Sequence, residues 1–107
     1  MAKKGKSDMI LSWFDAAEAK KFGESLARFF IASMPAGAHV GEKAFEQKAV
    51  KVLGQMAGQV AQFKQAHKLN TYKKAQLGNA FTWTLKDANI SPEYSDKLTE
   101  WLMLHVG

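Results

Sequence analysis

Residues 42–69 read EKAFEQKAVKVLGQMAGQVAQFKQAHKL, and the apolar side chains in this stretch recur every three or four positions. One stripe consists of Phe45, Ala49, Val52, Met56, Val60, Phe63 and His67, and it is widened by Val50, Leu53, Ala57 and Ala61. Because an α-helix has 3.6 residues per turn, this spacing places the stripe on one helix face. We therefore predict one long central helix over about 42–69, with this face turned toward a core.

Two glycines interrupt this predicted helix, at Gly54 and Gly58. Each costs roughly 1 kcal/mol of helix propensity relative to alanine, so packing is expected to compensate. Together with Ala57 and Ala61, they form a patch of small residues at which another helix can approach closely. The alternative is a local bend of the helix.

The flanking segments also carry helix signals. Asp15 and Glu18 have the spacing of a capping box, and Pro35 ends the helix that follows. Asn70 is expected to end the long helix in a left-handed conformation, and Thr71 to cap a third helix over about 72–88. Ser91-Pro92-Glu93 is a strong start signal for a fourth helix. We predict a single all-α domain over 1–107, a compact four-helix bundle without strands.

The first residues follow no such pattern. Residues 1–8 are basic and are expected to form a flexible tail, and Met9–Phe14 is ambiguous, with one short helical turn as an option. The apolar run there is too short for a secretory signal or a membrane span.

The chain has no cysteine, which excludes disulfides, thiolate zinc sites and cysteine nucleophiles. We expect a soluble, cytoplasmic protein.

Charge is distributed unevenly along this chain, whose net charge is +5. Residues 47–86 contain no acidic side chain and seven lysines, whereas the last 21 residues are acidic. The densest point is a helix-to-helix corner, and we define the basic corner as Lys64, Lys68, Tyr72, Lys73 and Lys74. Lys73 and Lys74 lie in a first helical turn, where the helix dipole disfavours cations. The basic corner is therefore a candidate site for an anionic group or an acidic partner, with a solvated basic face as the alternative.

Nucleic-acid binding is a second hypothesis. The segment Leu85–Ser91, followed by the fourth helix, has the outline of a helix-turn-helix motif, but that helix carries Glu93, Asp96 and Glu100 against Lys97. A helix that enters the major groove must meet phosphates, so this charge balance argues against specific DNA reading. Weak, non-specific binding through the basic residues of the middle segment stays open.

Haem binding is a third hypothesis. His67-Lys68-Leu69, Tyr72 and the segment 77–85 (LGNAFTWTL) resemble the stretch that follows the haem-ligating histidine in bacterial globins. That resemblance implies that His67 would be the proximal ligand. The sequence has no separate helix before His67, unlike that family. No histidine has a second ligand at helical metal-site spacing, so we predict no metal or cofactor.

Two aromatic residues, Phe30 and Trp83, lie off the main stripes, and Trp83 either points outward or packs under the N-terminal segment. If both are exposed, they are candidates for a protein-binding patch or a dimer seam. No catalytic motif is present. The leading hypothesis is therefore a non-enzymatic protein-interaction or regulatory module with an unidentified protein or acidic partner, which also includes a homodimer. The alternatives are a nucleic-acid or phosphate-binding protein and a haem-binding, globin-like protein.

Overall fold

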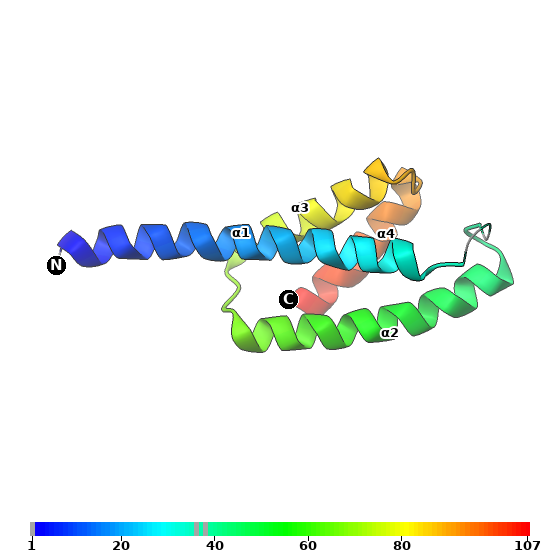
Figure 1. Cartoon of the computed structure of the whole chain (residues 1–107), viewed down its shortest axis with the longest axis horizontal. Coiled ribbons are helices and arrows are strands. Elements are labelled where there is room, and N and C mark those ends of the chain that lie inside the picture. Colours follow the sequence, from blue (N-terminus) through cyan, green and yellow to red (C-terminus); the bar gives the residue numbers. More distant parts are fainter. Residues whose placement is uncertain (1, 36, 38) are drawn as a thin grey trace.

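The structure is a computed structural model, which describes the backbone of residues 2–35, 37 and 39–107 and the side chains of residues 16–35, 37 and 39–107. It contains α1 (Ala2–Ser33), α2 (Lys43–Ala66), α3 (Thr71–Asp87) and α4 (Pro92–Val106). No strand occurs among the described residues. The predicted all-α bundle of four helices is confirmed (Figure 1).

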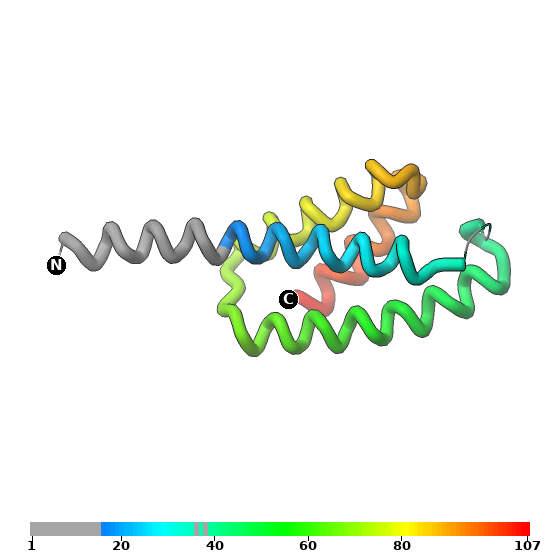
Figure 2. The backbone as a smooth tube through the Cα atoms, viewed as in Figure 1, coloured from blue at the N-terminus to red at the C-terminus, as the bar shows by residue number. Residues whose placement is uncertain are grey.

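The predictions for the first residues meet the structure only in part. α1 begins at Ala2, ahead of the start that we predicted at Asp15. The basic tail of residues 1–8, the segment Met9–Phe14 and the cap at Asp15 fall outside the residues whose side chains are described, which are the coloured part of Figure 2. The predicted end of this helix before Pro35 is confirmed.

The most extensive packing in the bundle joins α1 to α3. Ala19, Leu26, Ala27 and Phe30 of α1 are fully buried, as are Leu77 and Phe81 of α3. At Gly23 the two backbones approach so closely that a Cβ atom would clash with the carbonyl oxygen of Leu77. The small residues of α1 therefore set the distance between these helices. The proposal that Phe30 is exposed is wrong, because α1 turns it into the core.

The inner face of α2 follows the predicted stripe. Phe45, Ala49, Val52, Met56 and Val60 are buried, and Phe63 and His67 are half-buried. Phe63 lies flat between two rings, at 4.1 Å from the centroid of Phe22 and 4.3 Å from that of His67. The buried stripe is therefore correct over its first four turns and becomes solvent-accessible toward the end of the helix.

Three details of the α2 prediction are wrong. α2 ends at Ala66, three residues before the predicted end. Val50 is 71% exposed, because α2 touches its neighbours along a narrower face than the sequence pattern suggested. Nothing lies within 4 Å of a Cβ atom built at Gly54 or Gly58, so no helix approaches there. The close helix contact predicted at these glycines is found at Gly23 instead.

The connections between α2, α3 and α4 have well-defined caps. Asn70 is the N-cap of α3, with extended backbone, and its Oδ1 accepts from the Lys73 amide at 2.8 Å. This corrects the prediction that Asn70 ends α2 and that Thr71 caps α3. Asn89, with φ 68°, makes the left-handed turn after α3, and Ser91 caps α4 as predicted. These caps fix the direction in which α4 leaves the α3 turn.

No helix within the described part of the chain is long and apolar enough to cross a membrane.

Candidate functional site

The structure brings together three of the five residues of the basic corner. One hollow of about 340 Å³ is lined by Lys64, Lys68 and Lys74. Lys64 lies at the end of α2, Lys68 in the linker of residues 67–70 between α2 and α3, and Lys74 in the first turn of α3. We call this concavity the basic hollow, and its other lining residues are His67, Leu69, Val106 and Gly107. No Asp or Glu side chain is among these lining residues, but Gly107, the last residue of the sequence, carries the α-carboxylate of this chain. The hollow therefore has an excess of positive charge and is formed by four segments: the end of α2, the residues between α2 and α3, the first turn of α3 and the end of α4.

The other two residues of the basic corner do not line this hollow. Lys73 is only 8% exposed, and its Nζ donates to the carbonyl oxygen of Lys68 at 3.1 Å. Lys73 is thus a buried residue that holds the linker, not a residue of an open surface. Tyr72 is exposed and lies outside the basic hollow. Lys73 and Lys74 do not line the same hollow, because successive residues of a helix point about 100° apart.

Lys64 has a structural contact of its own. Its Nζ donates to the carbonyl oxygen of His105 at 3.0 Å, near the C-terminus of α4. A cation at the C-terminal end of a helix interacts favourably with the helix dipole and with carbonyl groups that lack an intrahelical partner. Lys64 therefore links α2 to α4 and keeps its ammonium group at the edge of the basic hollow.

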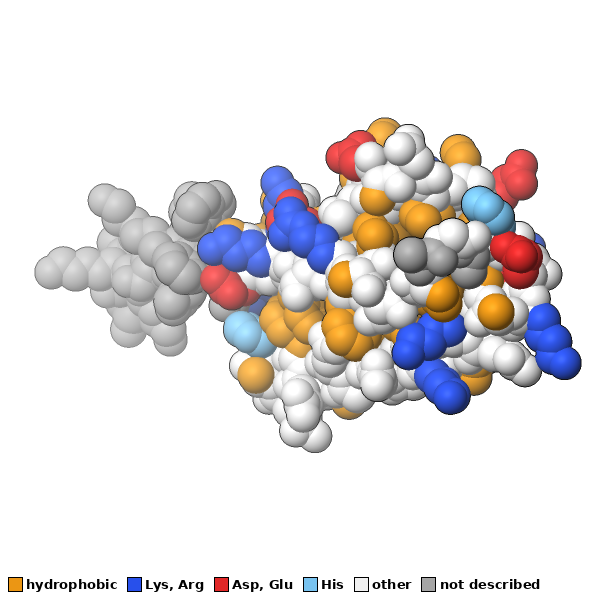
Figure 3. All heavy atoms as spheres, turned by 45° about the vertical axis from the view of Figure 1, so that its right-hand side comes forward, with side chains coloured by type: hydrophobic (Ala, Val, Ile, Leu, Met, Phe, Trp, Pro, Cys, Tyr) orange, Lys and Arg blue, Asp and Glu red, His pale blue; other side chains and the backbone are white. Residues whose placement is uncertain are grey.

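The remaining lysines of the acid-free stretch lie elsewhere. Lys48 and Lys51 border a separate hollow on α2, and Lys86 forms an ion pair with Asp96, with 3.3 Å between Nζ and Oδ1. On the face seen in Figure 3, the Lys and Arg side chains lie in separate groups. The stretch that looks continuously basic in the sequence is divided by folding.

A second concave region lies between α3 and α4. This α3/α4 groove has a volume of about 700 Å³, and its lining residues are Thr82, Asp96, Thr99, Glu100, Met103 and Leu104. Leu104 lies in the last turn of α4, and its side chain is 81% exposed. Thr82 Oγ1 is shielded from solvent and has no hydrogen-bond partner among the described residues. The groove thus combines apolar walls with carboxylates at its border.

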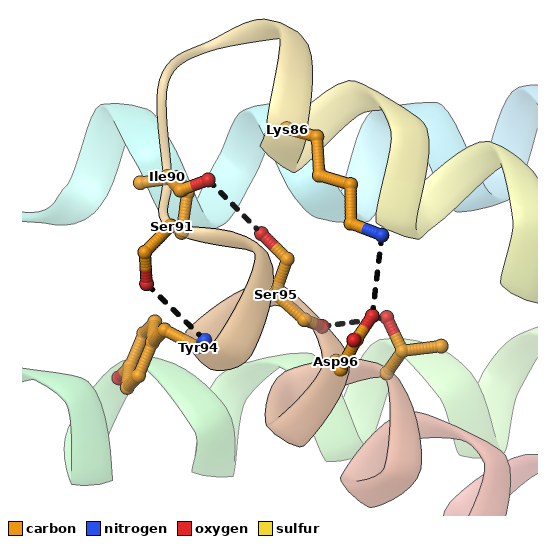
Figure 4. A network of polar contacts seen from close by, with 7 residues as sticks. Lys86, Ile90, Ser91, Tyr94, Ser95 and Asp96 are labelled. Atoms are coloured by element: carbon orange, nitrogen blue, oxygen red, sulfur yellow. Dashed lines mark hydrogen bonds and ion pairs between the residues drawn. The ribbon is translucent and has the colours of Figure 1, made fainter.

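A network of polar contacts orders the α3–α4 turn (Figure 4). The hydroxyl of Ser91 accepts from the Tyr94 amide at 3.2 Å, and Ser95 Oγ donates to the carbonyl oxygen of Ile90 at 3.4 Å. Ser95 is fully buried, so its hydroxyl must find a partner within the protein. The Lys86–Asp96 pair joins the two helices directly. Two hydrogen bonds and one ion pair therefore connect the α3–α4 turn and the end of α3 to α4.

Trp83 follows Thr82 along α3 and is 61% exposed, which confirms that it points outward. The Nζ atom of Lys86 lies 5.5 Å from the centre of the Trp83 ring, at cation–π distance. Trp83 is not among the lining residues of the α3/α4 groove, and a single exposed apolar side chain is normal on a protein surface. Sequence reasoning had found Trp83 but missed Leu104, whose position on the outer side of α4 only the bundle defines.

The histidines make local contacts. The His67 ring stacks on Phe63, and the Nδ1 atom of His105 lies 3.0 Å from the carbonyl oxygen of Trp101. The described residues contain no group of three or more His, Cys, Asp or Glu side chains that could hold a metal ion. His67 lines the basic hollow together with three lysines, whereas a haem pocket has mainly apolar walls. The haem hypothesis therefore has no support from the surroundings of His67.

One tyrosine has a shifted ionisation. Burial raises the pKa of Tyr94 above its ordinary value, and the nearby carboxylate of Glu46 raises it further. Tyr94 packs against Phe30 and Phe45, with ring centroids 6.2 and 5.6 Å away. The shift therefore belongs to the core between α1, α2 and α4, and both concave regions lie elsewhere.

Comparisons with known proteins identify no relative: no family model, no curated protein and no solved structure matches this chain.

Proposed function

We propose that this protein is a non-enzymatic interaction module and that the α3/α4 groove receives an apolar segment of a protein partner. The exposure of Leu104 along this groove carries the proposal. An amphipathic helix that lies in a groove between two helices is a common mode of peptide recognition. We further propose a cytoplasmic location, since a chain without cysteine does not depend on an oxidising compartment.

The charges at the groove indicate which partner residues fit beside the apolar ones. Asp96 is already paired with Lys86, whereas Glu100 has no ion pair among the described residues. A basic side chain of the partner next to Glu100 would complete a pair there, and complementary charges increase both specificity and association rate. The proposal therefore names a partner segment with apolar residues and at least one Lys or Arg.

The test compares two variants that introduce the same charge at two exposed apolar residues. Leu104→Lys changes the groove, and Val50→Lys changes a position on α2 that is also mostly exposed. Both should fold like the wild type by circular dichroism, because neither residue is buried. Burial of a leucine side chain is worth about 1.5–3 kcal/mol, so Leu104→Lys should weaken partner binding by about 10- to 100-fold.

The readout is binding of proteins from the source cells to each immobilised variant, followed by affinity measurement on the purified partner. A partner that binds wild type and Val50→Lys, but not Leu104→Lys, supports the proposal. Equal binding to all three forms contradicts it. Sedimentation of the purified protein covers a second copy as the partner: a dimer that only Leu104→Lys dissociates would place the dimer contact in the groove.

A further inference from the structure

We propose that the basic hollow binds the phosphate group of an anionic ligand, through the ammonium groups of Lys64, Lys68 and Lys74. Three lysines from three segments line this hollow, against one carboxylate, the terminal group of Gly107, so positive charge is in excess there. The proposal does not rest on the function proposed for the α3/α4 groove, because the two regions share no lining residue.

Two contacts order the backbone that carries Lys68 and Lys74. The buried Nζ of Lys73 donates to the carbonyl oxygen of Lys68, which fixes the linker backbone. Asn70 caps the first turn of α3, which carries Lys74. A site whose backbone is already ordered loses less conformational entropy on binding, and this raises affinity. The basic hollow is therefore preorganised around Lys68 and Lys74.

Electrostatics favour a multiply charged anion at this place. Like charges that converge on one concavity repel each other, and an anion between them removes that repulsion. Ammonium groups form charge-assisted hydrogen bonds with phosphate oxygens, as point charges without a fixed orientation. A volume of about 340 Å³ lies at the lower end of the range of ligand sites, roughly 300–1,000 Å³, and accommodates a small phosphate-bearing group.

The chain also contains a matched control. Lys48 and Lys51 are exposed lysines of the same acid-free stretch, but they border a different hollow together with Pro35, Ala44 and Gln47. The double variants Lys68→Gln/Lys74→Gln and Lys48→Gln/Lys51→Gln therefore remove the same net charge from two places. An effect of overall charge changes both variants equally, whereas a site changes only the first.

The probe is inorganic diphosphate, titrated into the full chain at low ionic strength by calorimetry and by NMR. We expect saturable binding to the wild type that weakens as salt is added. The Lys68→Gln/Lys74→Gln variant should bind at least about tenfold more weakly, since each lost charged hydrogen bond is worth about a factor of ten. The Lys48→Gln/Lys51→Gln variant should bind within about twofold of the wild type.

A second titration separates the sources of the phosphate group. A single-stranded oligonucleotide that diphosphate displaces would identify the nucleic-acid backbone as a ligand of the same hollow. An oligonucleotide that stays bound at saturating diphosphate occupies another surface, which leaves a small phosphate-bearing molecule as the ligand of the hollow. Absence of saturable diphosphate binding, or equal weakening in both double variants, overturns the proposal. Circular dichroism of each variant shows whether a loss of binding reflects a loss of fold.

Discussion

The close contact between α1 and α3 at Gly23 leads to a prediction about three glycines. At Gly23, a Cβ atom would clash with the backbone carbonyl oxygen of Leu77. A backbone atom cannot move without its helix, so Gly23→Ala requires α1 and α3 to separate. At Gly58, by contrast, nothing lies within 4 Å of the added carbon. The same substitution in two helix interiors should therefore change stability in opposite directions.

The magnitudes follow from two opposing terms. Replacing glycine by alanine within a helix stabilises it by roughly 1 kcal/mol. At Gly23 this gain is set against overpacking, which costs about 1–3 kcal/mol and more when backbone must shift. We expect Gly23→Ala to lower the free energy of unfolding by about 2 kcal/mol, and Gly58→Ala to raise it by about 1 kcal/mol. In a domain of this size, 1 kcal/mol corresponds to a change in Tm of about 4–8 °C.

Gly78 provides an intermediate case. There the added carbon would lie 2.8 Å from Sδ of Met103, which is part of a flexible side chain that can turn away. We expect Gly78→Ala to fall between the other two variants. The assay is urea denaturation followed by far-ultraviolet circular dichroism, with thermal unfolding as a second measure. If Gly23→Ala is as stable as Gly58→Ala, the close approach of α1 and α3 at Gly23 is refuted.

Three further predictions concern the core, a cap and an ionisation. Leu77→Ala should lower the free energy of unfolding by about 2–5 kcal/mol, because Leu77 is fully buried. Leu53→Ala should lower it by less, because Leu53 is only half-buried. Equal losses of the two variants in urea denaturation would contradict these burial assignments. Asn70→Ala removes the side-chain acceptor at the start of α3 and should cost about 1 kcal/mol in the same assay, and an unchanged midpoint would show that the cap contributes nothing. Because the pKa of Tyr94 is raised by burial and by Glu46, the folded state holds the phenol proton more tightly than the unfolded state does. Stability should therefore be complete below the unfolded pKa of about 10 and should fall as pH rises above it. Glu46→Gln should lower the Tyr94 pKa in a spectrophotometric titration of the phenol, and an unchanged pKa would exclude the carboxylate as a cause.

Helix positions and their inner stripes are properties that local sequence determines. The recurrence of Phe45, Ala49, Val52 and Met56 at helical spacing predicted a buried face that the structure confirms. Ser91 and Pro92 likewise predicted the start of α4, since capping depends on residues within one turn of each other. These features could be predicted because the interactions that cause them lie within a few residues along the chain.

The distances between helices and the grouping of lysines depend on residues far apart in the sequence. Gly23 and Gly58 are both interior helix glycines, and only the crossing of α1 with α3 makes one of them a contact point. Lys73 and Lys74 are neighbours with the same charge, yet Lys73 is buried against the linker and Lys74 borders the basic hollow. Periodicity defines the faces of each helix, but which face meets a neighbour is decided by long-range packing, because burial is a property of the whole assembly of helices.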